Sequence, residues 1–327
     1  MPSIWTMGEL LVEIMRPQPG LGLYNPGPFL GPYPSGAPAI FIDTVARLGH
    51  PAGMIGGVGE DDFGRGLIDR LRTDGVRCEH IHSYPGHATA VAFVSYFDDG
   101  SRQFIYHIDG TPAVLADGHG AEMIAGPGYF HIMGCSLMAN DLFRARIFGV
   151  MSVLHKKGAK ISFDPNIRPE LLGSRKLEDV VGPVLQLCHV LLPGVGELAL
   201  LGGQETVQEN VAALFARTPI EIIVVKRGKQ GASVYSRKDG AGESVDVPAY
   251  VVDEVDPTGA GDCFDAGFLC GLLEGLSLKG CAEVASAAGA LNAGAFGPME
   301  GKISRANVAK VMKTGCVPAE LLVRPQA

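Results

Sequence analysis

Several features are missing from this chain of 327 residues, and each absence excludes a class of protein. No apolar run approaches the roughly 18–20 residues that a membrane-spanning helix needs. The N-terminus lacks the basic and apolar regions of a secretory signal, so we expect no export. There are 27 basic and 35 acidic side chains, and the net charge of -8 argues against a surface that attracts nucleic acid. The seven cysteines form no CxxC pair, which favours reduced thiols and a cytoplasmic location.

The composition that is present is typical of a globular enzyme. Hydrophobic residues make up 46% of the chain and charged residues 19%, and glycine occupies 45 positions. A chain of this length is long enough for two domains, or for one large domain with an appendage. We find no internal repeat and no low-complexity tract.

From about residue 112 onward, strand patterns alternate with helix patterns. The predicted strands span 129–132, 160–163, 190–192 and 221–226, and the predicted helices span 141–157, 177–188 and 207–217. Earlier in the chain we predict strands over 4–7 and 52–55 and helices over 39–48 and 63–72. This alternation predicts an α/β fold with a doubly wound, mainly parallel sheet flanked by helices. In such a sheet, the ligand crevice lies at the carboxyl ends of the strands.

Two further segments predict a small, separate β-sheet. Residues 89–97 and 102–108 are β-rich and flank Asp98-Asp99-Gly100-Ser101, which is a strong hairpin signal. The stretch from Arg16 to Pro38 is crowded with proline and glycine, so we do not expect it to be helical. An isolated hairpin is marginally stable, and we therefore expect these segments to join as a lid beside the main sheet.

The stretch from Asp256 to Asp262 is the most informative part of the sequence. Its small residues, Gly259, Ala260 and Gly261, come just before an apolar run with helical spacing. Glycines let backbone N–H groups approach an anion, and a helix N-terminus adds partial positive charge. This pattern suits phosphoryl transfer, with Asp262 placed to accept a hydroxyl proton. A Gly-rich structural turn, with Thr258 or Asp256 as the helix N-cap, is the alternative.

Polar side chains also follow three of the predicted strands. Asp164, Asn166 and Arg168 follow the strand over 160–163, Glu197 follows the next strand, and Lys226 ends the strand over 221–226. Because the carboxyl ends of parallel strands meet at one edge, we expect these side chains to converge. The alternatives are a strand-ending turn at the first group and a solvated base at Arg168.

Six motifs occur in an order that is characteristic of a known family. The N-terminal half carries Gly8-Glu9 with an acid at position 13, Ser35-Gly36-Ala37-Pro38 opening a helix, and Gly57-Val58-Gly59 followed by Asp61 and Phe63-Gly64. The C-terminal half adds Phe163-Asp164-Pro165-Asn166 with Arg168-Pro169, Lys226 with Gly228, and the run from Asp256 to Asp262. Over nearly its whole length, the chain therefore resembles the ribokinase-like (PfkB) carbohydrate kinases, of the tagatose and fructose kinase kind.

This resemblance implies an ATP-dependent kinase that uses Mg²⁺, and it implies roles for residues of this chain. Asp262 would be the catalytic base, Gly259, Ala260 and Gly261 the anion hole, and Arg168 a cation that neutralises phosphate oxygens. Magnesium would be held through water by Asp164, Asn166 and Glu197. Nucleotide contacts are implied at Lys226, Gly228, Gly231, Thr258, Gly259, Gly261 and Asn292. For residues 226–231, an ordinary basic turn is the alternative. For residues 287–298, it is a packed helix of small residues.

On the sugar side, the resemblance implies contacts from Glu13, Gly36, Ala37, Ile40, His107, Asp109 and Asp262. The chain departs from the family here, because Ile40 stands where an asparagine usually binds sugar hydroxyls, and Gly194 also replaces a usual asparagine. His107 and Asp109 occupy positions where relatives that act on acid sugars carry an arginine. We therefore expect a neutral monosaccharide as the substrate, and within this class a ketohexose such as tagatose or fructose. The alternatives are a kinase for an acid sugar such as 2-keto-3-deoxygluconate, or a sugar- or nucleotide-binding sensor without turnover.

The resemblance also implies a division of the chain. Residues 1–11, 37–86 and 112–316 would form an α/β kinase domain, residues 12–36 and 87–111 the β lid, and residues 317–327 a loosely held C-terminal tail. We expect a sugar and ATP as ligands, and neither nucleic acid nor a membrane as a partner. The sequence leaves open which sugar and which hydroxyl react, and whether K⁺ is required.

The strands of the predicted lid have exposed edges, and such edges invite pairing with another chain. We therefore expect a homodimer that forms through the lid. Light scattering at working concentration measures the mass in solution, and a monomeric mass would contradict this expectation.

Overall fold

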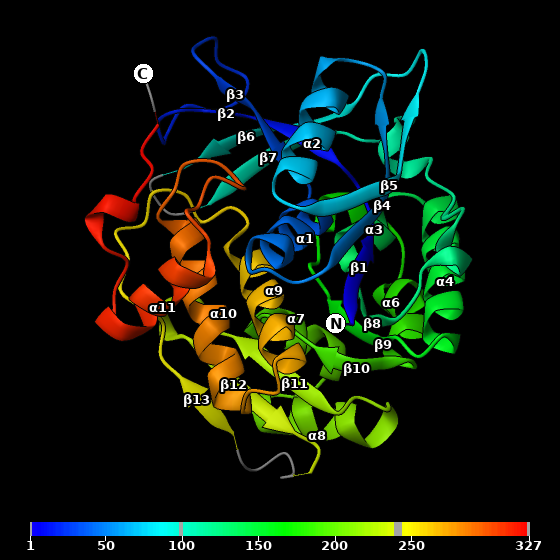
Figure 1. Cartoon of the computed structure of the whole chain (residues 1–327), viewed down its shortest axis with the longest axis vertical. Coiled ribbons are helices and arrows are strands. Elements are labelled where there is room, and N and C mark those ends of the chain that lie inside the picture. The colour runs from blue at the N-terminus through cyan, green and yellow to red at the C-terminus, as the bar shows by residue number, and fades with distance from the viewer. Residues whose placement is uncertain (1, 98–100, 239–243, 326–327) are drawn as a thin grey trace.

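A nine-stranded sheet forms the centre of the molecule. The structure, a computed structural model, describes residues 2–97, 101–238 and 244–325. The strands lie in the order β13-β12-β11-β10-β9-β8-β1-β4-β5, and every neighbouring pair from β11 to β5 is parallel. Figure 1 shows this sheet with helices on both sides. The strands are β1 Ser3–Met7, β4 Ala52–Gly59, β5 Val76–Tyr84, β8 Pro127–Met133, β9 Lys160–Asp164, β10 Cys188–Leu191, β11 Ile222–Lys226, β12 Ala232–Ser236 and β13 Val245–Val247.

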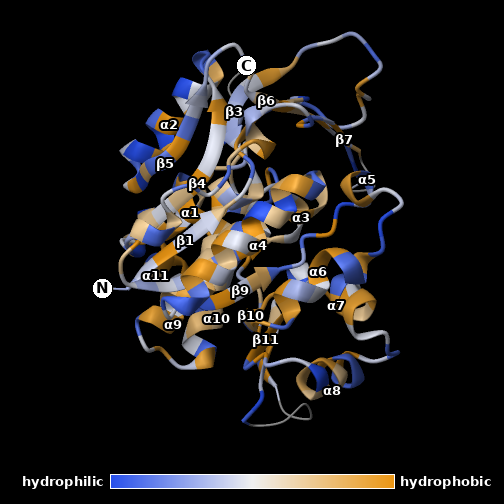
Figure 2. Ribbon diagram, turned by 90° about the vertical axis from the view of Figure 1, so that its right-hand side faces the viewer, coloured by the Kyte–Doolittle hydropathy of each residue, from blue (hydrophilic) through white to orange (hydrophobic). Residues whose placement is uncertain are grey.

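Helices cover both faces of this sheet because successive residues of a buried strand point to opposite sides. In β1, Ile4 joins the core beneath α1, α9 and α10, whereas the next residue, Trp5, joins the core beneath α4, α6 and α8. Figure 2 shows hydrophobic colours where helices and strands meet, and hydrophilic colours on outer helices such as α2. The helices are α1 Ala37–Arg47, α2 Asp62–Thr73, α3 Gly134–Ala139, α4 Asp141–Lys156, α5 Pro169–Leu172, α6 Leu177–Leu185, α7 Val195–Gly202, α8 Val207–Arg217, α9 Ala260–Leu273, α10 Leu278–Ala293 and α11 Arg305–Thr314.

A second, four-stranded sheet lies beside the first and is called the lid below. Its order is β3-β2-β6-β7, with β2 parallel to β6 and the outer pairs antiparallel. The strands are β2 Leu11–Met15, β3 Leu30–Ser35, β6 Ala90–Tyr96 and β7 Arg102–His107. The predicted fold class, a doubly wound, mainly parallel sheet with a small β-sheet lid, is thus confirmed. Three residues of the predicted hairpin turn, 98–100, lie outside the described residues.

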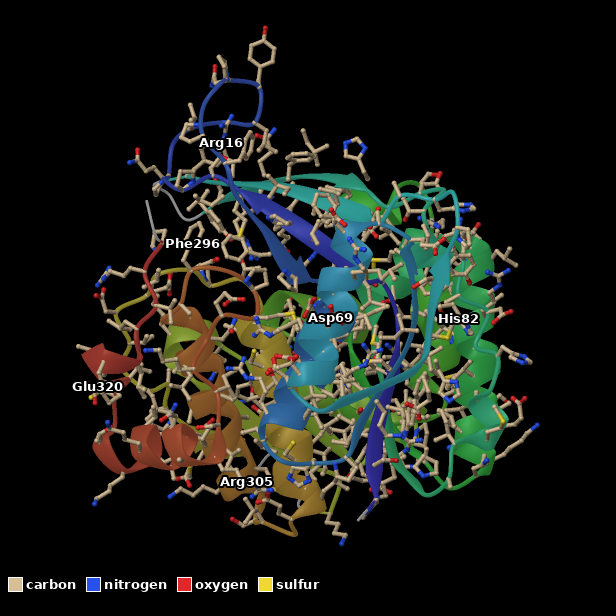
Figure 3. All side chains as sticks on the ribbon, turned by 45° about the horizontal axis from the view of Figure 1, so that its top comes forward. Arg16, Asp69, His82, Phe296, Arg305 and Glu320 are labelled. Carbon is tan, nitrogen blue, oxygen red and sulfur yellow. The ribbon has the colours of Figure 1, made fainter. Side chains whose placement is uncertain are left out.

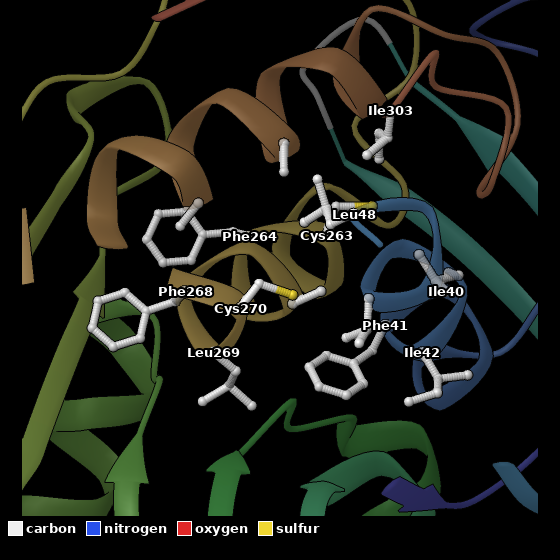
Figure 4. Close-up of a cluster of buried hydrophobic side chains, with 14 of the residues drawn as sticks. Ile40, Phe41, Ile42, Leu48, Cys263, Phe264, Phe268, Leu269, Cys270 and Ile303 are labelled. Carbon is white, nitrogen blue, oxygen red and sulfur yellow. The ribbon is translucent and has the colours of Figure 1, made fainter. Parts of the chain in front are cut away.

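Helix α9, which carries Asp262, is held closely by its neighbours. A Cβ at Gly267 would lie 2.8 Å from the Cα of Ala285, and a Cβ at Gly271 would lie 2.9 Å from the Cα of Cys281. The missing side chains therefore let α10 approach α9 closely. Figure 4 shows Cys263 and Phe268 of α9 in the core that also contains Phe41 of α1. The alternative interpretation of residues 287–298, a packed helix of small residues, is confirmed as far as Ala293.

The structure differs from the sequence prediction in two segments and agrees with it in a third. Helix α1 begins at Ala37, two residues earlier than predicted, because Pro38 lies in its first turn, where no backbone N–H is needed. Part of the proline-rich segment forms β3, in agreement with the predicted lid, and this edge strand tolerates Pro32 and Pro34. The C-terminal segment, expected to be loose, is held by a bond from the N–H of Phe296 to the carbonyl of Val323. Across the described residues, no helix is both long and apolar enough to cross a membrane.

Candidate active site

The loop from Asp256 to Gly259 leads into α9 and orients the start of that helix. Gly259 is the N-cap with a φ of 78°, a conformation that favours glycine. A Cβ at this position would also lie 2.6 Å from the carbonyl oxygen of Pro298. Thr258 and Asp256 were the expected N-caps, but neither caps the helix. Since no side chain of the described residues caps α9, its first N–H groups remain available to an anion. We call residues 256–262 the anion loop below.

Asp262 lies in the first turn of α9 and is buried, with 7% of its surface exposed. Its Oδ1 accepts a hydrogen bond of 3.2 Å from Nδ2 of Asn166. Burial and the nearby carboxylate of Asp164 raise the pKa of Asp262, Lys226 and Arg168 oppose the shift, and the net pKa is about 7. A carboxyl with this pKa exchanges a proton readily near neutral pH, which suits a general base.

Lys226 ends β11 and lies between two buried carboxylates. Its Nζ is 2.7 Å from Oδ2 of Asp164, at the end of β9, and 3.1 Å from both oxygens of Asp265 in α9. Burial alone would lower the pKa of Lys226, but Asp164 and Asp265 raise it, so the ammonium group stays charged. Burial and the neighbouring Asp164 raise the pKa of Asp265, whereas Lys226 holds the pKa of Asp164 below its usual value in spite of burial. The cluster therefore places one buried cation between two buried acids.

A small cavity of about 60 Å³ lies between the lid and the anion loop. Residues of the sequence prediction that line it come from both halves of the chain: Glu13, Gly36, Ala37, Ile40, Asn166, Arg168, Thr258, Gly259 and Asp262. Residues distant in sequence are thus brought together at the carboxyl edge of the main sheet. Thr258 and Gly259, which were predicted on the nucleotide side, line this cavity instead of the larger one described below.

Two buried glutamates face the small cavity from the N-terminal segment. Ser35 donates a hydrogen bond of 2.6 Å to Oε1 of Glu13, and Oε2 of Glu13 has no partner among the described residues. Burial raises the pKa of Glu13 to about 7. Glu9, which belongs to the Gly8-Glu9 motif but was not predicted as a site residue, accepts a hydrogen bond from Cys135, and burial raises its pKa. The unpaired oxygen of Glu13 is an acceptor that a ligand hydroxyl can use.

The structure corrects the prediction for β7. His107 and Asp109 are exposed and do not line the small cavity. The lining residues are instead Arg102, Phe104, Tyr106 and Ile108, which alternate along the strand and share its inner face. The alternation in the sequence could have found them, but it does not say which of the two faces is turned inward.

This correction adds Arg102 to the cavity, which already contains the predicted Arg168. Arg168 is half-buried, and no carboxylate among the described residues pairs with its guanidinium group. Arg102 is exposed, and its guanidinium carbon lies 5.7 Å from the centre of the Phe104 ring. Burial alone would lower the pKa of Arg168, but Cys135, Tyr106 and Asp262 raise it. The cavity therefore contains two cations that remain available to a ligand.

A larger cavity of about 560 Å³ lies on the other side of the anion loop. Lys226, Gly228 and Gly231, all predicted for the nucleotide, line it together with Ala260 and Gly261. Apolar side chains supply most of the remaining wall: Ala249, Val251, Val252, Pro257, Phe264, Ala290 and Ala293. Since Gly259 lines the small cavity and Gly261 the larger one, the anion loop lies at the junction of the two cavities.

Besides His107 and Asp109, three predicted site residues line neither cavity. Asn292 is fully buried, and its Nδ2 donates to the carbonyl oxygens of Thr258, at 2.7 Å, and Pro298, at 3.1 Å. The side-chain amide of Asn292 thus holds the anion loop through a hydrogen bond to its backbone. Asp164 is bound by Lys226, and Glu197 accepts backbone N–H bonds from Gly194 and Ile167, both at 2.8 Å.

The predicted magnesium residues do not form a direct binding site. Both oxygens of Glu197 already accept hydrogen bonds, and a lysine neutralises Asp164. Oδ1 of Asn166 has no partner among the residues that the structure describes, and it is the one free oxygen of this set there. Over the described ranges, no group of three or more His, Cys, Asp or Glu side chains is arranged to hold a metal ion. Contacts to a metal through water stay a prediction.

Comparison with known proteins finds relatives along almost the whole chain. Residues 6–305 match the pfkB family of carbohydrate kinases. Fructokinase-1 of Oryza sativa subsp. japonica is 31% identical over 322 residues, which are 94% of this chain and 97% of that protein. An E. coli protein provisionally assigned as ribokinase II, solved with ATP and Mg²⁺, is 38% identical with a TM-score of 0.88, and the match covers 96% of this chain and 100% of that one. A double mutant of the fructokinase of Vibrio cholerae, solved with fructose, ADP and K⁺, is 26% identical with a TM-score of 0.80. This match covers 95% of this chain and 98% of that one.

The ion cluster around Lys226 generates a prediction about stability. In Lys226→Met, two buried acids lose their cation, so we expect the free energy of unfolding at pH 8 to fall by about 3–5 kcal/mol. This loss of unfolding free energy should be smaller at pH 5.5. Without the cation, burial raises the pKa of Asp164 in the folded variant, so Asp164 takes up a proton as the pH falls. A folded state that binds more protons than the unfolded chain gains stability as the pH falls.

Urea unfolding at the two pH values measures this effect. Lys229→Met is the matched control, because Lys229 lies in the turn after β11 but is 85% exposed. We expect it to change the stability by less than about 0.5 kcal/mol. A loss of equal size at pH 5.5 and pH 8 in Lys226→Met would show that the charge of the cluster does not govern stability.

Proposed function

The chain belongs to the pfkB family of carbohydrate kinases, and we propose that it transfers the terminal phosphoryl group of ATP to a hydroxyl of a neutral monosaccharide. The observation that carries this proposal is the position of the anion loop between the two cavities. A phosphoryl group that passes from a nucleotide in the larger cavity to a sugar in the smaller one must pass the start of α9. Asp262 is buried at this point, on the side of the smaller cavity.

In the proposed reaction, Asp262 is the general base that accepts the proton of the sugar hydroxyl. Its pKa of about 7 is suited to this task at neutral pH. The N–H groups of Gly259, Ala260 and Gly261 stabilise the charge on the transferred group, because phosphoryl transfer is catalysed mainly by positioning and electrostatic stabilisation. Arg168 lies close enough to Asp262 to influence its pKa, and its free guanidinium neutralises phosphate oxygens.

The sugar is bound between the lid and the edge of the main sheet. We propose that Glu13 accepts hydrogen bonds from sugar hydroxyls through its unpaired Oε2, and that Gly36, Ala37 and Ile40 form the floor of the site. A ketohexose is the proposed substrate, supported by relatives that are named fructokinases. The proposal covers both tagatose and fructose, since no feature of the cavity lining selects one of these sugars over the other.

The nucleotide is bound in the larger cavity, against Gly228 and Gly231, with its phosphates directed to Lys226 and Gly261. Mg²⁺, which is present together with ATP in a solved relative, would partly neutralise the phosphates. Asp164, Asn166 and Glu197 would contact it through water, as predicted. All steps assigned here to this chain use its own side chains and backbone.

An acid sugar such as 2-keto-3-deoxygluconate is the second candidate substrate. The expectation of a neutral sugar rested on the absence of an arginine at positions 107 and 109. Arg102 and Arg168 line the small cavity instead, and neither pairs with a carboxylate of the described residues. These two cations are the specific observation in favour of a substrate carboxylate.

The cytoplasmic location and a homodimer through the lid also stay predictions. The outer side of the lid exposes Phe29 and Ile105, at 37% and 43%. These apolar side chains favour pairing of two lids.

Replacing the proposed base tests the mechanism. We expect Asp262→Asn to lower kcat by about 10²–10⁴, because proton acceptance is lost while the shape of the side chain is kept. In the wild-type protein, kcat/KM should fall about tenfold per pH unit below the pKa of about 7, where the base is protonated. Initial rates of ADP release from pH 5.5 to 8.5 measure both effects.

Glu13→Gln is the matched control, because Glu13 faces the same cavity and also has a pKa of about 7. This variant should raise KM for the sugar and keep the decline of kcat/KM below pH 7. If Asp262→Asn retains substantial turnover, or if Glu13→Gln abolishes the decline, the assignment of the base is wrong.

A panel of sugars separates the two candidate substrates. We expect D-fructose and D-tagatose to be phosphorylated, with kcat/KM for 2-keto-3-deoxygluconate at least 100-fold lower. For the neutral sugars, Arg102→Gln should change kcat/KM by less than about fivefold, since an exposed cation contributes little. Gln103→Ala, an exposed residue on the opposite face of β7, is the control. Preference for the acid sugar, with a loss of about 10-fold to 100-fold in Arg102→Gln, would establish the second candidate instead.

A further inference from the structure

The lid is bonded to the anion loop through the hydroxyl of Tyr96. Tyr96 is the last residue of β6, and its hydroxyl donates a hydrogen bond of 2.7 Å to Oδ1 of Asp256. The same hydroxyl is in hydrogen-bond contact with Oγ1 of Thr258. Burial and the charge of Asp256 raise the pKa of Tyr96, so the hydroxyl stays protonated and keeps donating. This contact joins two segments that are 160 positions apart in the sequence.

Asp256 connects this tyrosine to the backbone on both sides of the active site. Its carboxylate is buried, with 1% of the residue exposed. Oδ1 also accepts the backbone N–H of Thr258 at 2.9 Å, and Oδ2 accepts the N–H of Gly297 at 3.0 Å. Hydrogen bonds to an ionised acceptor are shorter and stronger than those between neutral groups. One carboxylate thus fixes the start of the anion loop, the loop after α10 and the end of a lid strand relative to one another.

Apolar packing reinforces the same contact. Met15 and Val94 of the lid form a small core with Phe296, and Val255 packs against it. Val255 directly precedes Asp256, and Phe296 directly precedes Gly297, so the lid rests on the neighbours of both bonded residues. Figure 3 labels Phe296 close to the strands of the lid. The contact is therefore built from a polar centre and an apolar surround.

The same side of the lid strands also faces the sugar site. Tyr96 of β6 is paired in register with Arg102 of β7, and Arg102 lines the small cavity together with Tyr106. A ligand that contacts β7 therefore acts on the strand next to Tyr96. Three parts of the molecule that the reaction must coordinate, the sugar cavity, the lid and the anion loop, are linked within a few residues.

We propose that Tyr96 is a positioning residue that couples the lid to the anion loop. Its bonds to Asp256 and Thr258 hold the N–H groups of residues 259–261 in the orientation that receives the phosphoryl group. These bonds form only while the lid lies on the anion loop. Tyr96 itself lines neither the small cavity nor the larger one. This inference rests on the proposed sugar kinase activity for its kinetic consequences, while its structural consequence does not depend on turnover.

The test compares Tyr96→Phe with Tyr33→Phe. Tyr33 also belongs to the lid, and its ring packs on Phe296 at 5.8 Å, but its hydroxyl makes no hydrogen bond within the described residues. Each variant removes one hydroxyl and keeps the ring. We expect Tyr96→Phe to lower kcat by about 10-fold to 100-fold, which corresponds to the loss of a hydrogen bond to a charged acceptor. KM for the sugar should change by less than threefold, and Tyr33→Phe should match the wild-type protein.

A second readout works without substrate. Hydrogen exchange followed by mass spectrometry in the ligand-free protein should show faster exchange of peptides that cover residues 256–262 in Tyr96→Phe, but not in Tyr33→Phe. Wild-type exchange in Tyr96→Phe would overturn the proposal, whatever the kinetics. So would an effect confined to KM for the sugar. If the wild-type protein phosphorylates no sugar of the panel, the proposed function fails, while the exchange experiment still decides whether Tyr96 holds the loop.

Discussion

The buried cation of Lys226 is the interaction on which the rest of the site depends. Its ammonium group joins the end of β11 to Asp164 at the end of β9 and to Asp265 in α9. Without this cation, two acids would lie in a buried environment without compensation, and such an arrangement is strongly unfavourable. The same cluster acts on the chemistry, because Asp164 raises the pKa of Asp262 and Lys226 lowers it. The position of α9 and, after burial, the pKa of the proposed base therefore both depend on this cluster.

The active site is built where rigid elements meet. Helix α9 is fixed by close packing against α10, and the amide of Asn292 supports the anion loop through two carbonyl oxygens. On the opposite side, the lid contacts the loop through Tyr96 and the small core around Phe296. The backbone N–H groups that we propose as the anion hole are thus constrained from the main sheet and from the lid. Such preorganisation lets fixed dipoles stabilise charge without reorganising during the reaction.

Much of this arrangement follows from the sequence, and the exceptions have identifiable causes. The strand–helix alternation and the carboxyl-edge rule place Asp164, Asn166 and Lys226 near α9, and the fold confirms this sheet. The inner face of β7 was assigned wrongly, because a shift of one residue turns every side chain of a strand to the other face. Which face of β7 is turned inward is decided by pairing with β6, which local sequence does not encode. Asn292 and Tyr96 were missed in their structural roles because their partners lie 34 and 160 positions away.

The charges around the small cavity bear directly on the proposed substrate. Arg168 is half-buried beside Asp262, and a cation in that position is best compensated by the phosphoryl group that arrives at the same place. Arg102 is exposed and contacts Phe104, so water can solvate its charge when no ligand is bound. Neither arginine therefore requires a carboxylate on the sugar. Glu13, in contrast, presents a buried and unpaired oxygen that needs a donor, and a sugar hydroxyl supplies one without adding charge. The electrostatics of the cavity thus favour a neutral sugar as the acceptor, although the cavity is rich in charged side chains.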